Sequence, residues 1–347
     1  MKHPIKINKS YSVINQIAKD IKADRIVILV DENTKKYCLP RFLKKSKIKG
    51  SIIEIQSGEE NKDIDTLQSI WEQMIREGMS RKSLLINLGG GVIGDMGGFA
   101  ASTYMRGMAF IQVPTTLLSM VDASVGGKLG IDFGQMKNMI GVFNAPHLVW
   151  IDTKYLITLP EDQLQSGMGE VIKHSLIADK ELWKLLLKQT EITDWDTLVK
   201  RNVAIKKAVV KADPKEKGLR KILNYGHTVG HAIESHYLLS DTPLLHGQAI
   251  IMGMLIENII SKDRGLLSPK QCNKINTFLA SQVKAISLKA SQSDLEAMLL
   301  TMANDKKNSN GKLKFSLLKS PGSCTYDVTV SPSEVLRALN ESQLFSV

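Results

Sequence analysis

The sequence predicts an α/β N-terminal domain with a mostly parallel, doubly wound sheet, residues 1–160, and an all-α C-terminal domain, residues 161–347. Two observations predict this fold class. Up to about residue 152, short β-branched and aliphatic runs alternate with helical patterns, which indicates a mostly parallel sheet covered by helices. Beyond Pro160 such runs nearly disappear, and apolar residues recur at helical spacing. A length of 347 residues is also typical of two domains.

Five short apolar runs predict the strands of the sheet. The runs are rich in Ile, Leu and Val, as strands buried in a parallel sheet usually are. The predicted strands cover residues 25–30, 51–56, 83–88, 109–113 and 148–151. Between the second and third strands, helical spacing predicts a helix over residues 63–78, which Gly78 ends.

Helical periodicity dominates the second half of the chain. It predicts helices over residues 161–178, 180–188, 196–210, 230–237, 248–261 and 271–280. A late β segment is expected at residues 312–318.

Composition excludes several classes of protein. Apolar residues make up 43% and charged residues 23%, which is ordinary for a globular protein and excludes a disordered or coiled-coil chain. No apolar run approaches the roughly 18 residues that a membrane helix needs, and no secretory signal is evident. The three cysteines are far apart, which favours a reducing compartment. We therefore expect a cytoplasmic protein without a membrane partner.

The chain is basic, with a formal net charge of +11. The first fifty residues contribute 13 Lys/Arg and 4 Asp/Glu. These charges are dispersed with few aromatic residues among them, so a solvated basic face is favoured over a nucleic-acid site. We expect no nucleic-acid partner.

A glycine-rich stretch follows the third predicted strand. Residues 87–141 hold 12 of the 25 glycines. Its first segment, NLGGGVIGD, lies between a strand and a helix, where backbone N–H groups bind anions. Close packing of the helix on the sheet would explain the same glycines, and the pattern is neither a dinucleotide fingerprint nor a Walker loop. Both interpretations are open.

Two further segments of this stretch carry polar side chains. Thr115 and Thr116 follow a predicted strand, where they either cap the next helix or bind a phosphate or ribose. The motif DASVGGK ends at Lys128, and Lys137 and Asn138 follow nine residues later. Single lysines are usually solvated, but two of them in a glycine-rich region, each close to Asp or Asn, keep a ligand-binding role open.

Histidines and a glutamate indicate a metal site in the second half of the chain, which holds five of the seven histidines. His227 and His231 are four residues apart and share a helical face, as paired metal ligands do. His246 opens a further helix. Glu170 and Lys173 share a face too, as a surface ion pair or as part of the site. Two histidines and a glutamate with an open fourth position form the ligand set of a catalytic zinc. The alternative is that the histidines are buried core residues, which need no metal.

Taken together, the motifs resemble those of the 3-dehydroquinate synthase family of sugar-phosphate cyclases. The resemblance runs from about Gly58 to Phe315. It rests on GGGVIGDMGGFAAS, YMRG, PTTLL, DASVGGK, KN, GEVIKH, residues 205–220, LNYGHTVGHAIE, HG and NDKK, which occur in the family's order. Departures are small: Gln248 stands where the family often has an acidic residue, and Pro214 interrupts an acidic run.

The resemblance implies an NAD-binding Rossmann-like domain, a helical domain that holds zinc or cobalt, an active site in the cleft between them, and a homodimer. The implied metal ligands are Glu170, His227 and His246. His231 then becomes a catalytic or substrate-contacting residue, which replaces the pairing suggested by its spacing from His227.

The resemblance also implies the other site residues. The implied catalytic residues are His231, Lys128, Lys173, Arg106 and Asp122. The implied substrate-binding residues are Lys206, Arg220, Asn224, Asn138 and one of Lys306 and Lys307. The implied NAD-binding residues are Ser57, Gly58, Glu59, Lys62, Gly91, Val92, Ile93, Gly94, Asp95, Thr115, Thr116, Lys128, Lys137, Tyr155, Leu156, Ile157 and Thr158.

The implied reaction converts 3-deoxy-D-arabino-heptulosonate 7-phosphate to 3-dehydroquinate and phosphate, in the shikimate pathway to aromatic amino acids. It combines transient oxidation by NAD+, phosphate elimination, reduction and intramolecular aldol closure, so NAD is not consumed. The substrate carries a carboxylate and a phosphate, and arginine grips such groups in a fork.

Three other functions fit part of the sequence. A cyclase with an inosose or valiolone product would share the fold, NAD and metal, but has less use for Arg220, Lys206 and Asn224. A metal-dependent alcohol or polyol dehydrogenase would release NADH. A nucleic-acid-binding protein leaves the glycine clusters and the Glu/His set unexplained.

Overall fold

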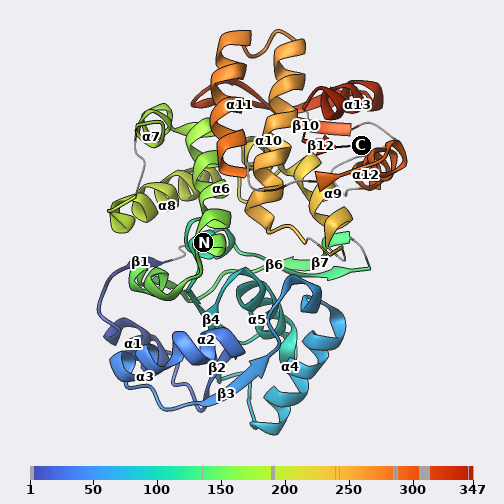
Figure 1. Ribbon diagram of the computed structural model, residues 1–347. Helices are drawn as coiled ribbons and strands as arrows, with labels where there is room; N and C mark the ends of the chain where they lie inside the picture. The colour runs from blue at the N-terminus through green and yellow to red at the C-terminus, as the bar shows by residue number, and fades with distance from the viewer. Residues whose placement is uncertain are drawn as a thin grey trace. The chain divides into compact units, whose positions relative to one another are not determined.

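The computed structural model describes residues 4–134, 136–188, 192–238, 240–241, 243–283, 286, 288–304, 313–342 and 344–346. The chain divides into two compact units (Figure 1). The first comprises Met1–Leu164 and Asp194–Val203, and the second Gln165–Thr193 and Ala204–Val347. Among the described residues, no helix combines the length and apolar character that crossing a membrane requires.

A six-stranded parallel sheet forms the centre of the first unit, in the order β1-β8-β5-β4-β2-β3 (Figure 1). Its strands are β1 (Ile5–Ile7), β2 (Ile26–Asp31), β3 (Ser51–Ile55), β4 (Leu84–Gly89), β5 (Ala109–Pro114) and β8 (Leu148–Ile151). The five predicted strands are confirmed to within one residue, and β1 is an additional strand. Every residue of β4 is buried, which is why its sequence shows no alternation.

Helices and one hairpin complete the first unit. The helices are α1 (Ser12–Asp20), α2 (Glu32–Tyr37), α3 (Leu39–Ser46), α4 (Ile64–Arg76) and α5 (Gly91–Thr103), with short turns η1 (Glu59–Asn61), η2 (Tyr104–Arg106), η3 (Ser119–Ala123) and η4 (Thr153–Thr158). The antiparallel strands β6 (Lys128–Phe133) and β7 (Met136–Phe143) were not expected from the sequence. Gly130 and Gly141 pair across this hairpin, and the low β propensity of glycine hides both strands.

Helix α5 packs closely on the sheet because glycines line its inner face. A Cβ atom at Gly97 would lie 2.1 Å from Oδ1 of Asn87 on β4, and one at Gly98 would lie 2.4 Å from a methyl group of Leu129. At Gly91, the first residue of the helix, the nearest atom would be 3.7 Å away. Close packing therefore explains the glycines in the middle of α5, while the backbone at its N-terminus is less crowded.

The second unit is mainly helical, so the predicted fold class is confirmed. Its helices are α6 (Glu161–Ala178) and α8 (Trp195–Ala212), which both begin in the first unit, α7 (Lys180–Leu186), η5 (Leu219–Asn224), α9 (His227–Tyr237), α10 (His246–Asp263), α11 (Pro269–Val283), α12 (Gln292–Asn304) and α13 (Pro332–Glu341). The late β segment is half of a hairpin, β10 (Leu313–Ser320) and β11 (Ser323–Val330), and a short parallel pair joins β9 (Leu288–Lys289) to β12 (Phe345–Ser346).

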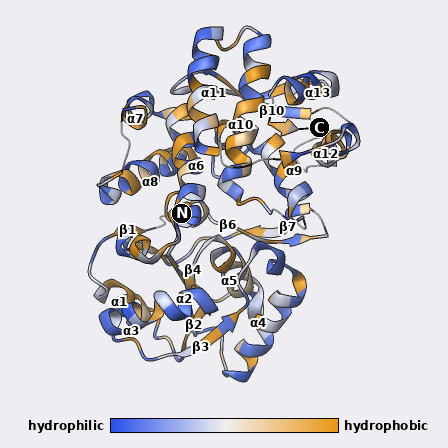
Figure 2. Cartoon of the chain, viewed as in Figure 1, coloured by the Kyte–Doolittle hydropathy of each residue, from blue (hydrophilic) through white to orange (hydrophobic). Residues whose placement is uncertain are grey.

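Helix α10 is the central helix of this unit, with 14 of its 18 residues buried. Most of these residues are apolar (Figure 2). A Cβ atom at Gly247 would lie 1.8 Å from the carbonyl oxygen of Ser166 on α6, and one at Gly253 would lie 2.0 Å from that of Gly226, just before α9. Only glycine permits these approaches, so α10 contacts the backbones of both α6 and α9.

We expect Gly253→Ala to lower the free energy of unfolding by about 1–3 kcal/mol, because the new methyl group overlaps the Gly226 backbone. Chemical denaturation of the ligand-free protein measures this change. Gly91→Ala, also in a helix but with ordinary contacts, is the control and should be nearly neutral. Equal effects of the two substitutions would show that the close approach of Gly253 to Gly226 does not constrain this position.

Candidate active site

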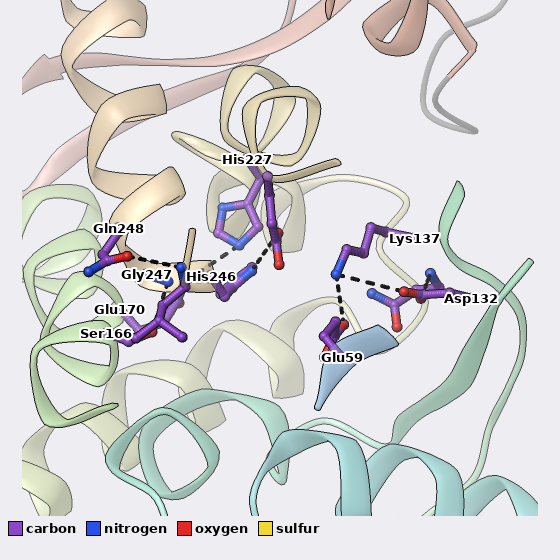
Figure 3. A network of polar contacts seen from close by, with 12 residues as sticks. Glu59, Asp132, Lys137, Ser166, Glu170, His227, His246, Gly247 and Gln248 are labelled. Carbon is purple, nitrogen blue, oxygen red and sulfur yellow. Dashed lines mark hydrogen bonds and ion pairs between the residues drawn. The ribbon is translucent and has the colours of Figure 1, made fainter. Parts of the chain in front are cut away.

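Three helices of the second unit bring Glu170, His227 and His246 together (Figure 3). Glu170 lies midway along α6, and the two histidines are the first residues of α9 and α10. His227 Nε2 lies 3.5 Å and His246 Nε2 lies 3.6 Å from Oε1 of Glu170. The residues that the family resemblance implies as metal ligands are therefore within reach of one another.

His231 lies beside the two histidines of this cluster. Its ring centroid is 5.1 Å from that of His227 and 5.8 Å from that of His246. Nitrogens of the three rings lie within 4.8 Å of one another, so by distance His231 is an alternative third ligand. Glu170 is fully buried, and its negative charge offsets the charge of a divalent ion, which a neutral imidazole does not.

The second ring nitrogen of each predicted histidine ligand has a partner. His246 Nδ1 lies 3.1 Å from Oε2 of Glu234, and His227 Nδ1 donates to the carbonyl oxygen of Tyr225 at 3.1 Å. Metal-binding histidines usually donate this N–H to a carboxylate or a carbonyl, which fixes the ring. Two oriented imidazoles and a buried carboxylate fit zinc or cobalt with an open coordination position.

Buried charges surround this cluster. Lys173, one turn after Glu170 on α6, forms an ion pair with it, and both side chains are buried. Burial by itself lowers the pKa of His246, but the carboxylates of Glu234 and Glu170 outweigh it and raise the pKa to about 10. Because imidazole binds metal in its neutral form, a proton and a metal ion compete for His246.

The loop before α9 holds Arg220, one of the predicted substrate-binding residues. The carboxylate of Asp213 accepts hydrogen bonds from three backbone N–H groups, at 3.0, 2.7 and 3.1 Å. The donors are Lys217, Gly218 and Arg220. Arg220 Nη1 donates to the carbonyl oxygen of Pro214 at 2.8 Å, and the arginine is only 2% exposed. The loop thus holds the backbone of Arg220 through Asp213 and its guanidinium through the Pro214 carbonyl.

The other predicted substrate-binding residues of this unit differ in their surroundings. Asn224 Nδ2 donates to Oε1 of Glu216 at 2.7 Å. Lys206 on α8 is buried, unlike an ordinary solvated lysine. Lys306 and Lys307 lie outside the described residues.

A polar network in the first unit joins five of the residues implied to bind NAD or substrate. Lys62 Nζ lies 2.7 Å from Oδ2 of Asp95 and donates to Oδ1 of Asn138 at 2.7 Å. Lys137 Nζ lies 3.0 Å from Oε1 of Glu59 (Figure 3). Burial opposes the charge of Lys62, but Asp95 and Glu59 outweigh it and raise its pKa above the usual value.

Five predicted residues of the first unit occupy segment ends and turns. Arg106 is exposed and ends η2 with a φ of 68°. Asp122 lies in η3, and Lys128 is the exposed first residue of β6. Thr115 is buried, while Thr116 Oγ1 accepts from the backbone N–H of Ser119 at 3.1 Å, as the capping interpretation requires.

The remaining predicted NAD residues lie in three other places. Gly91, Val92, Ile93 and Gly94 form the first turn of α5, and Tyr155, Leu156, Ile157 and Thr158 lie in η4. Ser57 Oγ accepts from Nδ2 of Asn33 at 3.1 Å, and Gly58 has a φ of 110°. The Tyr155 side chain is buried with its hydroxyl 3.3 Å from that of Tyr11, whereas Ile157 is exposed.

Several residues next to these groups were missed in the sequence. Asp31 ends β2, a position at which Rossmann domains often place a ribose-binding acid, and it caps α2. Asp132 accepts from the backbone N–H of Asn138 at 2.6 Å. Glu234 follows His227 by seven residues, about two helical turns, which is the signal that could have identified it.

A parallel sheet with a helical second unit is the fold of the sugar-phosphate cyclases. A 2-epi-5-epi-valiolone synthase from Streptomyces hygroscopicus subsp. jinggangensis 5008, solved with NAD+ and Zn2+ bound, matches with a TM-score of 0.85 and 24% identity, over 99% of this chain and 97% of that one. A 2-deoxy-scyllo-inosose synthase complexed with carbaglucose-6-phosphate, NAD+ and Co2+ matches with a TM-score of 0.83 and 25% identity, over 97% and 96%.

Sequence comparison defines the family within this class. The model of the 3-dehydroquinate synthase N-terminal region matches residues 52–166, and that of the C-terminal region matches residues 167–308. A 3-dehydroquinate synthase from Parabacteroides distasonis is 38% identical over 334 residues, which cover 95% of this chain and 94% of the relative. The chain belongs to the 3-dehydroquinate synthase family, as its motifs predicted, and its reaction is the one that gives the family its name.

We expect Lys62→Met to lower the free energy of unfolding by about 3 kcal/mol, because it removes the cation of a buried ion pair with Asp95. Lys35→Met is the matched control, since the Lys35–Glu54 pair is exposed and should contribute less than about 1 kcal/mol. Chemical denaturation without ligand measures both. A loss for Lys62→Met no larger than the control would show that the network does not stabilise the unit.

Proposed function

We propose that this chain converts 3-deoxy-D-arabino-heptulosonate 7-phosphate to 3-dehydroquinate and inorganic phosphate, as a carbon–oxygen lyase that depends on NAD and a divalent metal. The observation that carries the proposal is the meeting of Glu170, His227 and His246 in a member of this family. We also propose that residues 1–160 bind NAD, that residues 161–347 bind metal and substrate, and that the enzyme is a cytoplasmic homodimer.

Glu170, His227 and His246 would hold the metal, since their donor set and the fixed histidine rings fit zinc or cobalt. A metal bound there supplies a Lewis acid for a substrate oxygen. The cyclases of similar fold that were solved with Zn2+ or Co2+ support this assignment.

The first unit would hold NAD. The cofactor supplies reversible hydride transfer. The first turn of α5 would bind its diphosphate, because backbone N–H groups at a helix N-terminus attract anions. Thr115, Thr116 and the Lys62 network would contact the rest of the cofactor, and both cyclases of similar fold were solved with NAD+.

Cations would bind the two anionic ends of the substrate. Arg220 suits a carboxylate or phosphate because its guanidinium presents a planar fork, and its loop already fixes it in place. A fixed cation needs little reorganisation when substrate arrives. Lys206, Asn224, Arg106 and Asn138 would supply further contacts.

His231 would move a proton at the substrate through a ring nitrogen. It lies beside both predicted histidine ligands, so it is placed to act near the open position of the metal site. Lys128, Lys173 and Asp122 would complete the catalytic set. Lys173 would also stabilise the buried charge of Glu170.

A phosphate-release assay tests the function. With catalytic NAD+, zinc or cobalt and the heptulosonate phosphate, the enzyme should release inorganic phosphate without net NADH. A chelator should abolish release, and added zinc should restore it. Stoichiometric NADH would instead indicate a dehydrogenase, and turnover of a carboxylate-free sugar phosphate alone would indicate a different cyclase.

We expect Arg220→Ala to raise KM for the sugar phosphate about 30–100-fold, since a charged hydrogen-bonded contact contributes about 2–3 kcal/mol. NAD affinity, measured by fluorescence titration, should stay near normal. Lys217→Ala in the same loop is the control, because that residue contributes its backbone N–H to the loop. Equal losses of NAD and substrate affinity in Arg220→Ala would show that the arginine has another role.

A further inference from the structure

The peptide group between Tyr225 and Gly226 connects a buried carboxylate to His227. The Gly226 N–H donates to Oε2 of Glu257 at 2.7 Å. The Tyr225 carbonyl, at the other end of the same peptide group, accepts from His227 Nδ1 at 3.1 Å. The carboxylate, the peptide and the imidazole thus form one continuous chain of hydrogen bonds, which ends at the Nε2 that faces Glu170.

The packing of α9 on α10 builds this chain. Glu257 follows His246 by 11 residues on α10, about three helical turns, so both lie on one face of that helix. The close approach of Gly253 to Gly226 brings the peptide group over this face. Tyr225 is anchored as well, because its hydroxyl donates to Oδ1 of Asn258 at 2.6 Å.

Glu257 is fully buried in a largely apolar helix. Burying a carboxylate costs free energy unless hydrogen bonds or opposite charges compensate it. The Gly226 N–H compensates part of this cost, and so does the positive end of the α9 dipole, since α9 begins at His227. An apolar side chain would fill this position without the desolvation cost of a carboxylate, so packing alone does not account for Glu257.

We propose that Glu257 is a positioning residue for the metal site, which orients His227 and strengthens it as a ligand through the Tyr225–Gly226 peptide. The inference rests on the proposed function, because it takes His227 as a metal ligand. A carboxylate bound to the peptide N–H polarises the peptide and makes its carbonyl a stronger acceptor. A stronger acceptor on Nδ1–H makes Nε2 a better donor to a metal. For His246, Glu234 fills the same role by direct contact.

The test is the zinc affinity of Glu257→Gln. Glutamine keeps the shape and an accepting oxygen but removes the charge. We expect zinc affinity, measured by competition with a chromophoric chelator, to fall about tenfold, the lower end of the range for partners of histidine ligands, because the effect passes through a peptide. The visible spectrum of the cobalt-substituted protein should change with it. Tyr225→Phe, which loses only the hydroxyl bond to Asn258, is the control and should keep its zinc affinity within about twofold.

A second measurement needs no substitution at Glu257. In the zinc-loaded unmodified protein, NMR of the His227 ring should show a slowly exchanging proton on Nδ1 and the metal on Nε2. Zinc on Nδ1, or wild-type zinc affinity in folded Glu257→Gln, would overturn the inference and leave the proposed function intact. Failure of the proposed function gives another result, since His227→Ala would then bind zinc as tightly as the unmodified protein.

Discussion

Contact between helix backbones at glycines is the constraint on which the rest of the second unit depends. Each predicted metal ligand is the sequence neighbour of a glycine at a helix crossing: Glu170 follows Gly169, His227 follows Gly226, and His246 precedes Gly247. A Cβ atom at any of these glycines would lie under 3 Å from a neighbouring helix. Because the crossings and the ligands share the same turns, the packing that stabilises the bundle also sets the distances within the site.

Sequence reasoning succeeded where one local pattern decides the structure. Apolar runs predicted five of the six strands of the parallel sheet. Helical periodicity predicted a helix over residues 161–178, and α6 has the same bounds. It failed where partners are distant or where glycine hides a strand, as in the β6–β7 hairpin. Spacing alone selected His231 as the partner of His227, because it could not show that Glu170 from another helix lies 3.5 Å away. Asp213 and Glu257 act on backbone N–H groups, which carry no sequence signal.

The net charge of the chain says little about its ligand. The excess of basic residues lies in the first fifty positions, where the side chains of most lysines are exposed. Three of the cations predicted at the site are buried instead: Lys62 is paired with Asp95, Lys173 with Glu170, and Arg220 is held by a carbonyl oxygen. A buried cation acts at low dielectric, where its charge is worth more to a bound anion than that of a solvated lysine.

Three buried carboxylates give the second unit a reason to bind a divalent cation beside the histidines. Glu170, Glu234 and Glu257 are all buried, and each such charge costs several kcal/mol of desolvation before its partners are counted. Lys173 and the Gly226 N–H offset part of that cost, and without metal a proton on His246 offsets more. A divalent ion on the histidines would recover the remainder. The same acids that make the metal-free bundle costly would therefore increase its affinity for metal, so replacing one of them is expected to reduce both the desolvation cost and the metal affinity.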